Sequence, residues 1–397
     1  MIQPAGRPDS YTLIVPTYDR PALLSRLLDY LERQRADFSI VVLDSSHDGV
    51  RAANATRIAR SPLSIRLADY ATDVHPFLKI RDGLKLVTTA CCSICADDDV
   101  LVLPALRECL ALLDERSEVS AVHGSYFNFV ESEFFDLSAI MYRGPSVIAD
   151  APLDRLRQLF ARYEAVFYAV YRTHIMQEVF GSVGEVGTTL ARELLTAALT
   201  AVSGQIVRIA DFYYGRNTGA SLAYEHWHPF QIFASSPELI FREYPIFRQI
   251  VLDALSRTCG PDRSAADTAT ILDLIFLRYL GQFLGASVLD VITADRLQGM
   301  TTDATVEHVW KAFVRPRPRL YLREPLREPL IRRGLARLVP HRIAGRTVPR
   351  DYLVPGSTAR GTRTYRVFHE FLFPDRNGPA VVQRQTVLAL CEQLNGY

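Results

Sequence analysis

The chain has neither an excess of charge of one sign nor an apolar run long enough to cross a bilayer. Its 397 residues include 45 Lys and Arg and 44 Asp and Glu, which gives a formal net charge of +1. Nucleic-acid binding draws on an excess of basic side chains, so this balance gives no reason to expect it. No stretch reaches the roughly 18 apolar residues of a membrane-spanning helix, and the opening MIQPAGRPDSYTLIVPTYDR lacks the order of a signal peptide. We therefore expect a cytoplasmic protein.

Cysteine is scarce and is not spaced as a disulfide framework. Most of the cysteines lie inside apolar stretches, which favours a reducing compartment; they are Cys91, Cys92, Cys95, Cys109, Cys259 and Cys391. Cys92 and Cys95 form a CxxC, but no second pair and no histidine cluster accompanies them. A zinc or redox role is therefore disfavoured.

Strand and helix patterns alternate over the first 215 or so residues. Apolar or β-rich runs predict strands at 11–15, 38–43, 64–67, 91–96, 121–130, 166–171 and 205–214. Apolar residues at helical spacing predict helices at 20–33, 76–89, 103–113, 152–163 and 188–202. This alternation predicts a Rossmann-like α/β domain whose mostly parallel sheet has helices on both faces. No GxGxxG follows the first strand, which argues against a dinucleotide-binding version.

The composition changes after about residue 235. Two long helices are expected at 237–255 and 265–284, without strands between them. The segment 315–350 then holds eleven arginines and two glutamates, a local formal charge of +9. Three interpretations fit this segment: a solvated linker, a patch for anionic lipid headgroups at the inner face of the membrane, or a docking surface for an acidic partner. We expect an α/β domain at 1–235 and a mainly α-helical, Arg/Pro-rich region at 236–397.

Acidic residues follow three of the expected strands. Asp19 follows the first strand, Asp44 ends the second, and the consecutive residues Asp97, Asp98 and Asp99 end the fourth. Ligands collect at the carboxyl ends of parallel strands. Strand alternation would place Asp97 and Asp99 on one side and Asp98 on the other, and a pair of carboxylates suits a hard divalent cation. The alternative is that Asp98 or Asp99 caps the next helix, or that all three members of this aspartate trio lie in a solvated loop; the apolar strand before the trio and the neighbouring acids favour the site.

Three stretches in order, PTYDRPALL, VVLDSSHDG and KIRDGLKLVTTACCSICADDD, resemble the nucleotide-sugar glycosyltransferases of the GT-A fold, especially glycosyltransferase family 2. The resemblance covers roughly residues 10–220. It implies a GT-A catalytic domain that moves a sugar from a nucleoside diphosphate sugar, a UDP-sugar, to an acceptor hydroxyl. It further implies that the reaction is metal-dependent, of hexosyltransferase type and inverting. The acceptor would be a glycan, a lipid-linked molecule or a protein.

The resemblance also implies roles for individual residues. The donor nucleotide-sugar would be bound by Pro16, Thr17, Tyr18, Asp44, Arg81, Asp97 and Asp98. Within this set, Asp44 matches the aspartate that bonds the base and Arg81 a basic residue near the nucleotide. Asp99, together with Asp97, would hold Mn²⁺ or Mg²⁺.

An inverting transferase needs a general base, which the family usually supplies from an acidic motif that opens a late helix. Glu193 in LARELL matches that position, with Arg192 where a second acid is more common. Glu185 is the rival base, and an ordinary exposed helical acid is the alternative explanation of Glu193. Arg216 and His226 follow the last expected strand, where basic groups meet the diphosphate or the acceptor.

Two other classes of protein remain as alternatives. A nucleotidylyltransferase would carry a glycine-rich loop with a basic residue after its first strand, and PTYDRP is not such a loop. A non-catalytic module would keep the sheet for binding sugar or nucleotide, or as a scaffold. The region 236–397 would contact the acceptor, a partner, the membrane surface or a second subunit of a homo-oligomer.

Overall fold

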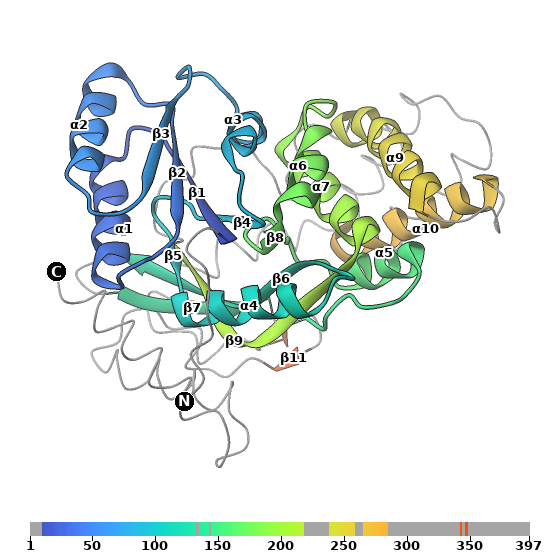
Figure 1. The fold of residues 1–397 in the computed structure, drawn as a ribbon. Coiled ribbons are helices and arrows are strands. Elements are labelled where there is room, and N and C mark those ends of the chain that lie inside the picture. The colour runs from blue at the N-terminus through green and yellow to red at the C-terminus, as the bar shows by residue number, and fades with distance from the viewer. Residues whose placement is uncertain are drawn as a thin grey trace, which may run out of the picture.

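The computed structural model describes residues 10–131, 135–142, 144–217, 238–258 and 265–284, and the antiparallel strands β10 (Arg342–Ile343) and β11 (Arg346–Thr347). A nine-stranded sheet runs in the order β3-β2-β1-β4-β8-β6-β9-β5, with β7 paired to β6. Figure 1 shows helices on both sides of this sheet. The expected α/β architecture is therefore confirmed.

The first half of the sheet is parallel. Its elements alternate in the order β1 (Tyr11–Thr17), α1 (Pro21–Arg33), β2 (Ser39–Asp44), α2 (Asp48–Ala59), β3 (Ile65–Asp69), α3 (Pro76–Gly83) and β4 (Cys91–Ile94). β1 pairs in parallel with β2 on one side and with β4 on the other, and β2 pairs in parallel with β3. The register places Thr17 opposite Asp44, so the ends of β1 and β2 are level.

The second half of the sheet is mixed. It contains β5 (Val100–Leu101), α4 (Leu103–Glu115), β6 (Val119–Glu131), β7 (Phe135–Met141), α5 (Pro152–Ala161), β8 (Val170–Arg172), α6 (Thr173–Gly181), α7 (Thr189–Ser203) and β9 (Gln205–Asn217). β8 is antiparallel to both β4 and β6, whereas β6 and β9 are parallel. Two elements are shorter than the sequence predicted. Only the short β8 forms within the strand expected at 166–171 and just beyond it. The helix expected at 76–89 ends at Gly83 and is followed by a single 3₁₀ turn, Leu84–Leu86.

Alternating side chains of β1 divide the core into two layers. Leu13 and Val15 pack with α1 and α4 in one cluster of buried residues, and Ile14 packs with α3, α5, α6 and α7 in the other. All three side chains are fully buried. Cys92 and Cys95 also lie in these layers, and burial raises the pKa of the Cys92 thiol to about 12. In the described structure, the two cysteines of the CxxC are therefore buried core residues.

Two later helices complete the layer around Ile14. The helices are α9 (Glu238–Thr258) and α10 (Ala265–Leu284), as expected from the sequence, and their apolar side chains belong to the same cluster as α5 and α7. Figure 1 shows α9 and α10 beyond α7. Glu243 of α9 accepts the backbone N–H of Gly187 at 2.5 Å, just before α7 begins. The predicted boundary at residue 235 lies outside the described residues and stays a prediction.

Within the described part of the chain, no helix is long and apolar enough to cross a membrane. The arginine-rich segment 315–350 and His226 lie outside the described residues, apart from the short β10 and β11.

Arg155 links α5 to the end of α7. Its guanidinium donates from Nε to the Ala201 carbonyl at 2.6 Å and from Nη2 to the Val202 carbonyl at 2.9 Å, and the residue is 7% exposed. Arg155→Met should lower the free energy of unfolding by about 2–4 kcal/mol, because it leaves buried carbonyls without donors. Arg157→Met is the matched control, since Arg157 lies on the same helix in an exposed ion pair with Asp154. Chemical denaturation measures both; equal losses would contradict the assignment.

Candidate functional site

The carboxyl ends of β1, β2 and β4 meet at one edge of the sheet. Thr17 ends β1, Asp44 ends β2, and the aspartate trio Asp97–Asp99 follows β4 after a short loop. The three acids are 0%, 8% and 3% exposed, so the trio is not a solvated loop. It does not cap α4 either, because the N-cap of α4 is Val102 and no side chain caps it. The trio is a buried acidic cluster at the edge where ligands bind in such sheets.

Thr17 connects this cluster to β2 and α3. Its hydroxyl donates to Oδ2 of Asp97 at 2.6 Å. Its carbonyl accepts from Nζ of Lys79 at 2.9 Å and from the backbone N–H of Ser45 at 3.2 Å. One residue at the end of β1 thus holds three neighbouring segments.

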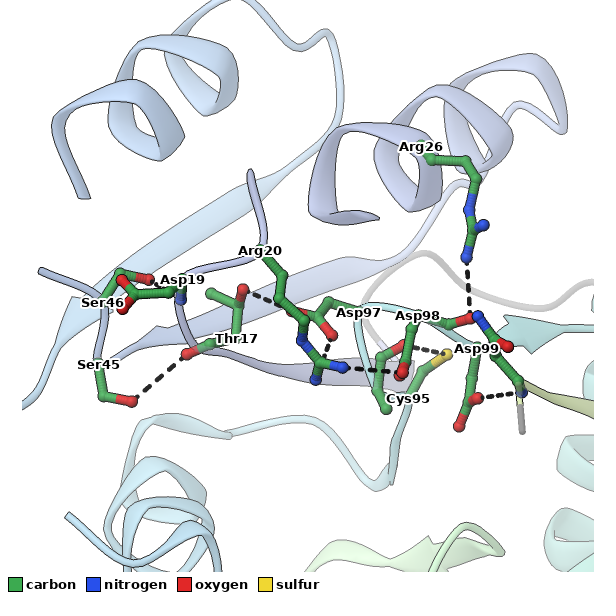
Figure 2. A network of polar contacts seen from close by, with 12 residues as sticks. Thr17, Asp19, Arg20, Arg26, Ser45, Ser46, Cys95, Asp97, Asp98 and Asp99 are labelled. Atoms are coloured by element: carbon green, nitrogen blue, oxygen red, sulfur yellow. Dashed lines mark hydrogen bonds and ion pairs between the residues drawn. The ribbon is translucent and has the colours of Figure 1, made fainter. Parts of the chain in front are cut away.

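Arg20 joins the first two acids of the trio. Its Nη2 lies 2.8 Å from Oδ1 of Asp97, and its Nη1 donates to Oδ2 of Asp98 at 2.8 Å. Figure 2 shows the guanidinium between the two carboxylates. The sequence predicted that the side chains of Asp97 and Asp99 would lie on one side of the strand and that of Asp98 on the other, and this prediction was wrong. The reason is that β4 ends at Ile94, so the two-residue period of a strand does not extend to the trio.

Asp97 carries an oxygen that accepts no hydrogen bond from the described residues. Oδ1 is buried, and its contact with Arg20 is an ion pair without hydrogen-bond geometry. Burial raises the pKa of Asp97 to about 6, against the lowering effects of Arg20 and the Thr17 hydroxyl. The negative charge of Asp97 is therefore only partly compensated.

Asp99 turns toward β9 and away from Arg20 (Figure 2). Its Oδ2 accepts from the Tyr214 hydroxyl at 2.8 Å and its Oδ1 from the backbone N–H of Asn217 at 2.7 Å. Burial, followed by repulsion from Asp98, raises the pKa of Asp99 to about 7. Asp97 and Asp99 thus lie in the same loop after β4, but the Asp97 carboxylate faces Thr17 and Arg20 whereas the Asp99 carboxylate faces β9.

Asp44 is fully buried at the end of β2. It accepts from the backbone N–H of Ser46 at 2.8 Å and from Nδ2 of Asn54 at 2.8 Å. These contacts tie the loop after β2 and the middle of α2 to the end of β2. The predicted contact of Asp44 with a nucleotide base stays a prediction.

The loop after β1 presents Tyr18 to solvent. Pro16 is half-buried in β1, whereas Tyr18 is 39% exposed, with its ring centroid 6.0 Å from that of His47. Asp19 has a φ of 51° and fixes the turn by accepting the His47 backbone N–H at 2.9 Å. An exposed aromatic ring beside the acidic edge suits stacking on a nucleotide base.

Lys79 lies at the acidic edge, although the sequence analysis did not identify it as a site residue. Its ammonium donates to Oγ of Ser45 at 2.7 Å as well as to Thr17, and burial lowers its pKa to about 8. Residues two apart in a helix point roughly 200° apart, so Lys79 and Arg81 cannot both face the strand ends. Arg81 instead contacts Asp82, with 3.2 Å between Nε and Oδ1. It also lines a separate cavity of about 380 Å³ with Leu84, Lys85, Gln177 and Gly181.

A second charged cluster surrounds Glu193 on α7. Oε1 of this partly buried side chain accepts from the Tyr163 hydroxyl at 3.1 Å. Burial raises the pKa of Glu193, against the lowering effects of Tyr163 and Arg216. Arg216 interacts electrostatically with both Asp99 and Glu193, so it links the two clusters. Glu185, the rival base, is exposed.

The acidic edge has ligands suited to a hard cation. Among the described residues, no three His, Cys, Asp or Glu side chains converge as a ready-made metal group. Mg²⁺ is, however, commonly held by one or two carboxylates together with substrate phosphates. Asp97 offers the buried oxygen that accepts no hydrogen bond within the described structure. The residues present therefore fit a divalent cation bound together with a ligand.

Neither a protein-family model nor a curated protein matches the sequence. The fold does have solved counterparts. S. aureus TarS, a GT-A-like glycosyltransferase, superposes with a TM-score of 0.50 at 16% identity, over 76% of this chain and 52% of TarS. TarS 1-349 in complex with UDP-GlcNAc gives a TM-score of 0.50 at 16% identity, over 77% of this chain and 81% of that one. The chain thus spans about half the length of TarS and has the GT-A fold that the sequence resemblance predicted.

The buried charge of Asp97 predicts a pH dependence of stability. A carboxyl whose pKa rises from 3.8 to about 6 on folding contributes stability that is present below pH 3.8 and is lost as the pH rises through 6. Between pH 4 and 7, wild type should therefore lose about 2 kcal/mol relative to Asp97→Asn. Urea denaturation in EDTA measures the difference.

Asp19→Asn is the control of opposite sign. Hydrogen bonds from His47 lower the pKa of Asp19, so its contribution is present at neutral pH and is lost as the pH falls. Parallel pH profiles for wild type and Asp97→Asn would contradict the burial of an ionised Asp97.

Proposed function

We propose that this chain is a glycosyltransferase that transfers a sugar from a nucleoside diphosphate sugar, a UDP-sugar, to an acceptor hydroxyl with inversion. The observation that carries the proposal is the pairing of two sites on a GT-A fold. A buried acidic edge follows β1, β2 and β4, and Glu193 lies beyond it, with Arg216 interacting with both. Donor and acceptor sites of one transfer reaction need this kind of adjacency.

The donor binds along the edge formed by β1 and β2. Tyr18 offers its exposed ring to the base, next to Pro16 and Thr17 on β1. Asp44 is held rigidly behind them by Ser46 and Asn54. The fold counterpart TarS 1-349, in complex with UDP-GlcNAc, supports a UDP-sugar as the donor class. Asp98 completes the donor-binding residues in this proposal, whereas Arg81, which contacts Asp82 and lines a different cavity, is not among them.

Asp97 and Asp99 hold Mn²⁺ or Mg²⁺ in this proposal. The support is the hard oxygen donors, the burial that raises the pKa values of both acids, and the Oδ1 of Asp97, which is buried and accepts no hydrogen bond from the described residues. A divalent cation bound there supplies positive charge to the diphosphate as it leaves. Arg216, half-buried on β9, contributes a fixed positive charge on the acceptor side of Asp99.

The proposed reaction is a single displacement. The acceptor oxygen forms a bond to the anomeric carbon while the bond from that carbon to the diphosphate oxygen breaks, and the electron pair leaves with the diphosphate. The Glu193 carboxylate takes the proton of the acceptor hydroxyl. Burial raises the pKa of Glu193 toward the range in which a carboxylate works as a base at neutral pH. Attack opposite the leaving group inverts the anomeric carbon.

Glu193→Gln should lower kcat by about 10²–10⁴-fold, because the amide cannot accept the proton. The affinity for UDP should stay unchanged, since Glu193 lies outside the donor edge. UDP release from a panel of UDP-sugars with Mn²⁺, beside calorimetric UDP binding, measures both quantities. Glu185→Gln is the matched control and should keep wild-type rates, as Glu185 is exposed. Full activity of Glu193→Gln would overturn the assignment of the base.

Tyr163→Phe should move the acidic limb of the kcat–pH profile to higher pH. The Tyr163 hydroxyl donates to the Glu193 carboxylate and favours its charged form, so its removal raises the pKa of Glu193. The rate well above that limb should stay close to wild type. The control is Tyr171→Phe, because the Tyr171 hydroxyl donates to the Val166 carbonyl at 2.7 Å and not to Glu193. Identical profiles for all three proteins would exclude Glu193 as the titrating group.

A further inference from the structure

Arg20 pairs with Asp97, one of the two proposed ligands of the divalent cation, and with its neighbour Asp98. It forms ion pairs of 2.8 Å with Asp97 and 2.8 Å with Asp98, whose side chains are 0% and 11% exposed. Planar guanidinium groups bridge oxyanions in this way, and a buried carboxylate without a counter-ion is unfavourable. While no other cation is present, Arg20 is thus the counter-ion that stabilises this part of the trio.

Arg20 is more exposed to solvent than the two acids with which it pairs. It lies in the loop between β1 and α1, and its side chain is 34% exposed, so the guanidinium is not enclosed by the core. A guanidinium binds phosphate oxygens as well as carboxylates, with the same planar geometry. Lys79, the other cation beside Asp97, is buried and donates to Thr17 and Ser45, so it is fixed.

We propose that Arg20 is an exchangeable counter-ion of the donor site. It pairs with Asp97 and Asp98 while the donor is absent, and pairs with the diphosphate once the donor is bound. Its departure exposes carboxylate oxygens to the divalent cation. The inference rests on the proposed function, because it requires a site for both a nucleoside diphosphate and a cation. It predicts that nucleotide and cation bind with positive coupling, since each favours the state without the Arg20 ion pairs.

The test measures Mn²⁺ binding to the full chain without nucleotide. Titration calorimetry and Mn²⁺ electron paramagnetic resonance both report this binding. Arg20→Gln removes the competing cation, so Mn²⁺ should bind on the order of tenfold more tightly than to wild type. UDP should bind more weakly, because the phosphate partner is lost. Loss of structure would weaken both ligands, so tighter Mn²⁺ with weaker UDP separates the proposal from a structural role.

Arg26→Gln is the matched control. Arg26 reaches the same residue, but its Nη2 donates to the backbone carbonyl of Asp98 at 2.9 Å and not to a carboxylate (Figure 2). Its Mn²⁺ affinity should equal that of wild type. If Arg20→Gln does not fold, Arg20→Lys decides the question, since an ammonium cannot bridge both acids. Tighter Mn²⁺ binding by the lysine variant then supports the proposal.

Failure of the inference differs from failure of the proposed function. If wild type binds UDP and Mn²⁺ but the Arg20 variants bind Mn²⁺ equally or more weakly, the exchange by Arg20 is overturned and the donor site stands. If wild type binds neither UDP nor Mn²⁺, the proposed function is overturned, and the inference with it.

Discussion

Thr17 is the residue on which the arrangement of the site depends. The register of β1 against β2 sets it level with Asp44, its hydroxyl bonds Asp97, and its carbonyl receives Lys79 and the chain after β2. Because β1 is buried between two other parallel strands, a shift by one residue would reverse which side chains enter each core layer. The packing of Leu13, Ile14 and Val15 therefore also fixes the position of the acids.

The cations at the acidic edge offset only part of the cost of burying its carboxylates. Arg20 serves two carboxylates, and Lys79 lies beside Asp97 with a pKa that burial lowers to about 8. Burial is the main cause of the raised pKa values of Asp97 and Asp99, and repulsion from Asp98 adds to it. Burying acids in this way costs stability, and acids with raised pKa values are common at functional sites.

The sequence predicted the positions of the strands at the candidate site correctly, but it did not predict the directions in which the site's side chains point. Apolar runs ended by Pro16 and Asp44 placed β1 and β2 correctly, because burial on both faces makes such strands continuous in sequence. Helix α2 was missed because only Asn54 is buried among its residues, so it has no apolar stripe. The partners of the aspartate trio, and the choice of Lys79 over Arg81, depend on where β4 ends and how α3 is rotated. Local spacing does not encode these tertiary features.

The acceptance of the Gly187 N–H by Glu243 makes the start of α7 depend on a helix some fifty residues later in the chain. Consider a chimaera that combines the α/β half of this chain with helices from another protein in place of α9 and α10. In it, the helix that bears Glu193 would lose the contact with Glu243, and its apolar side would be uncovered. The two regions are thus constrained to change together, because a substitution in α9 alters the anchor of the helix that bears Glu193.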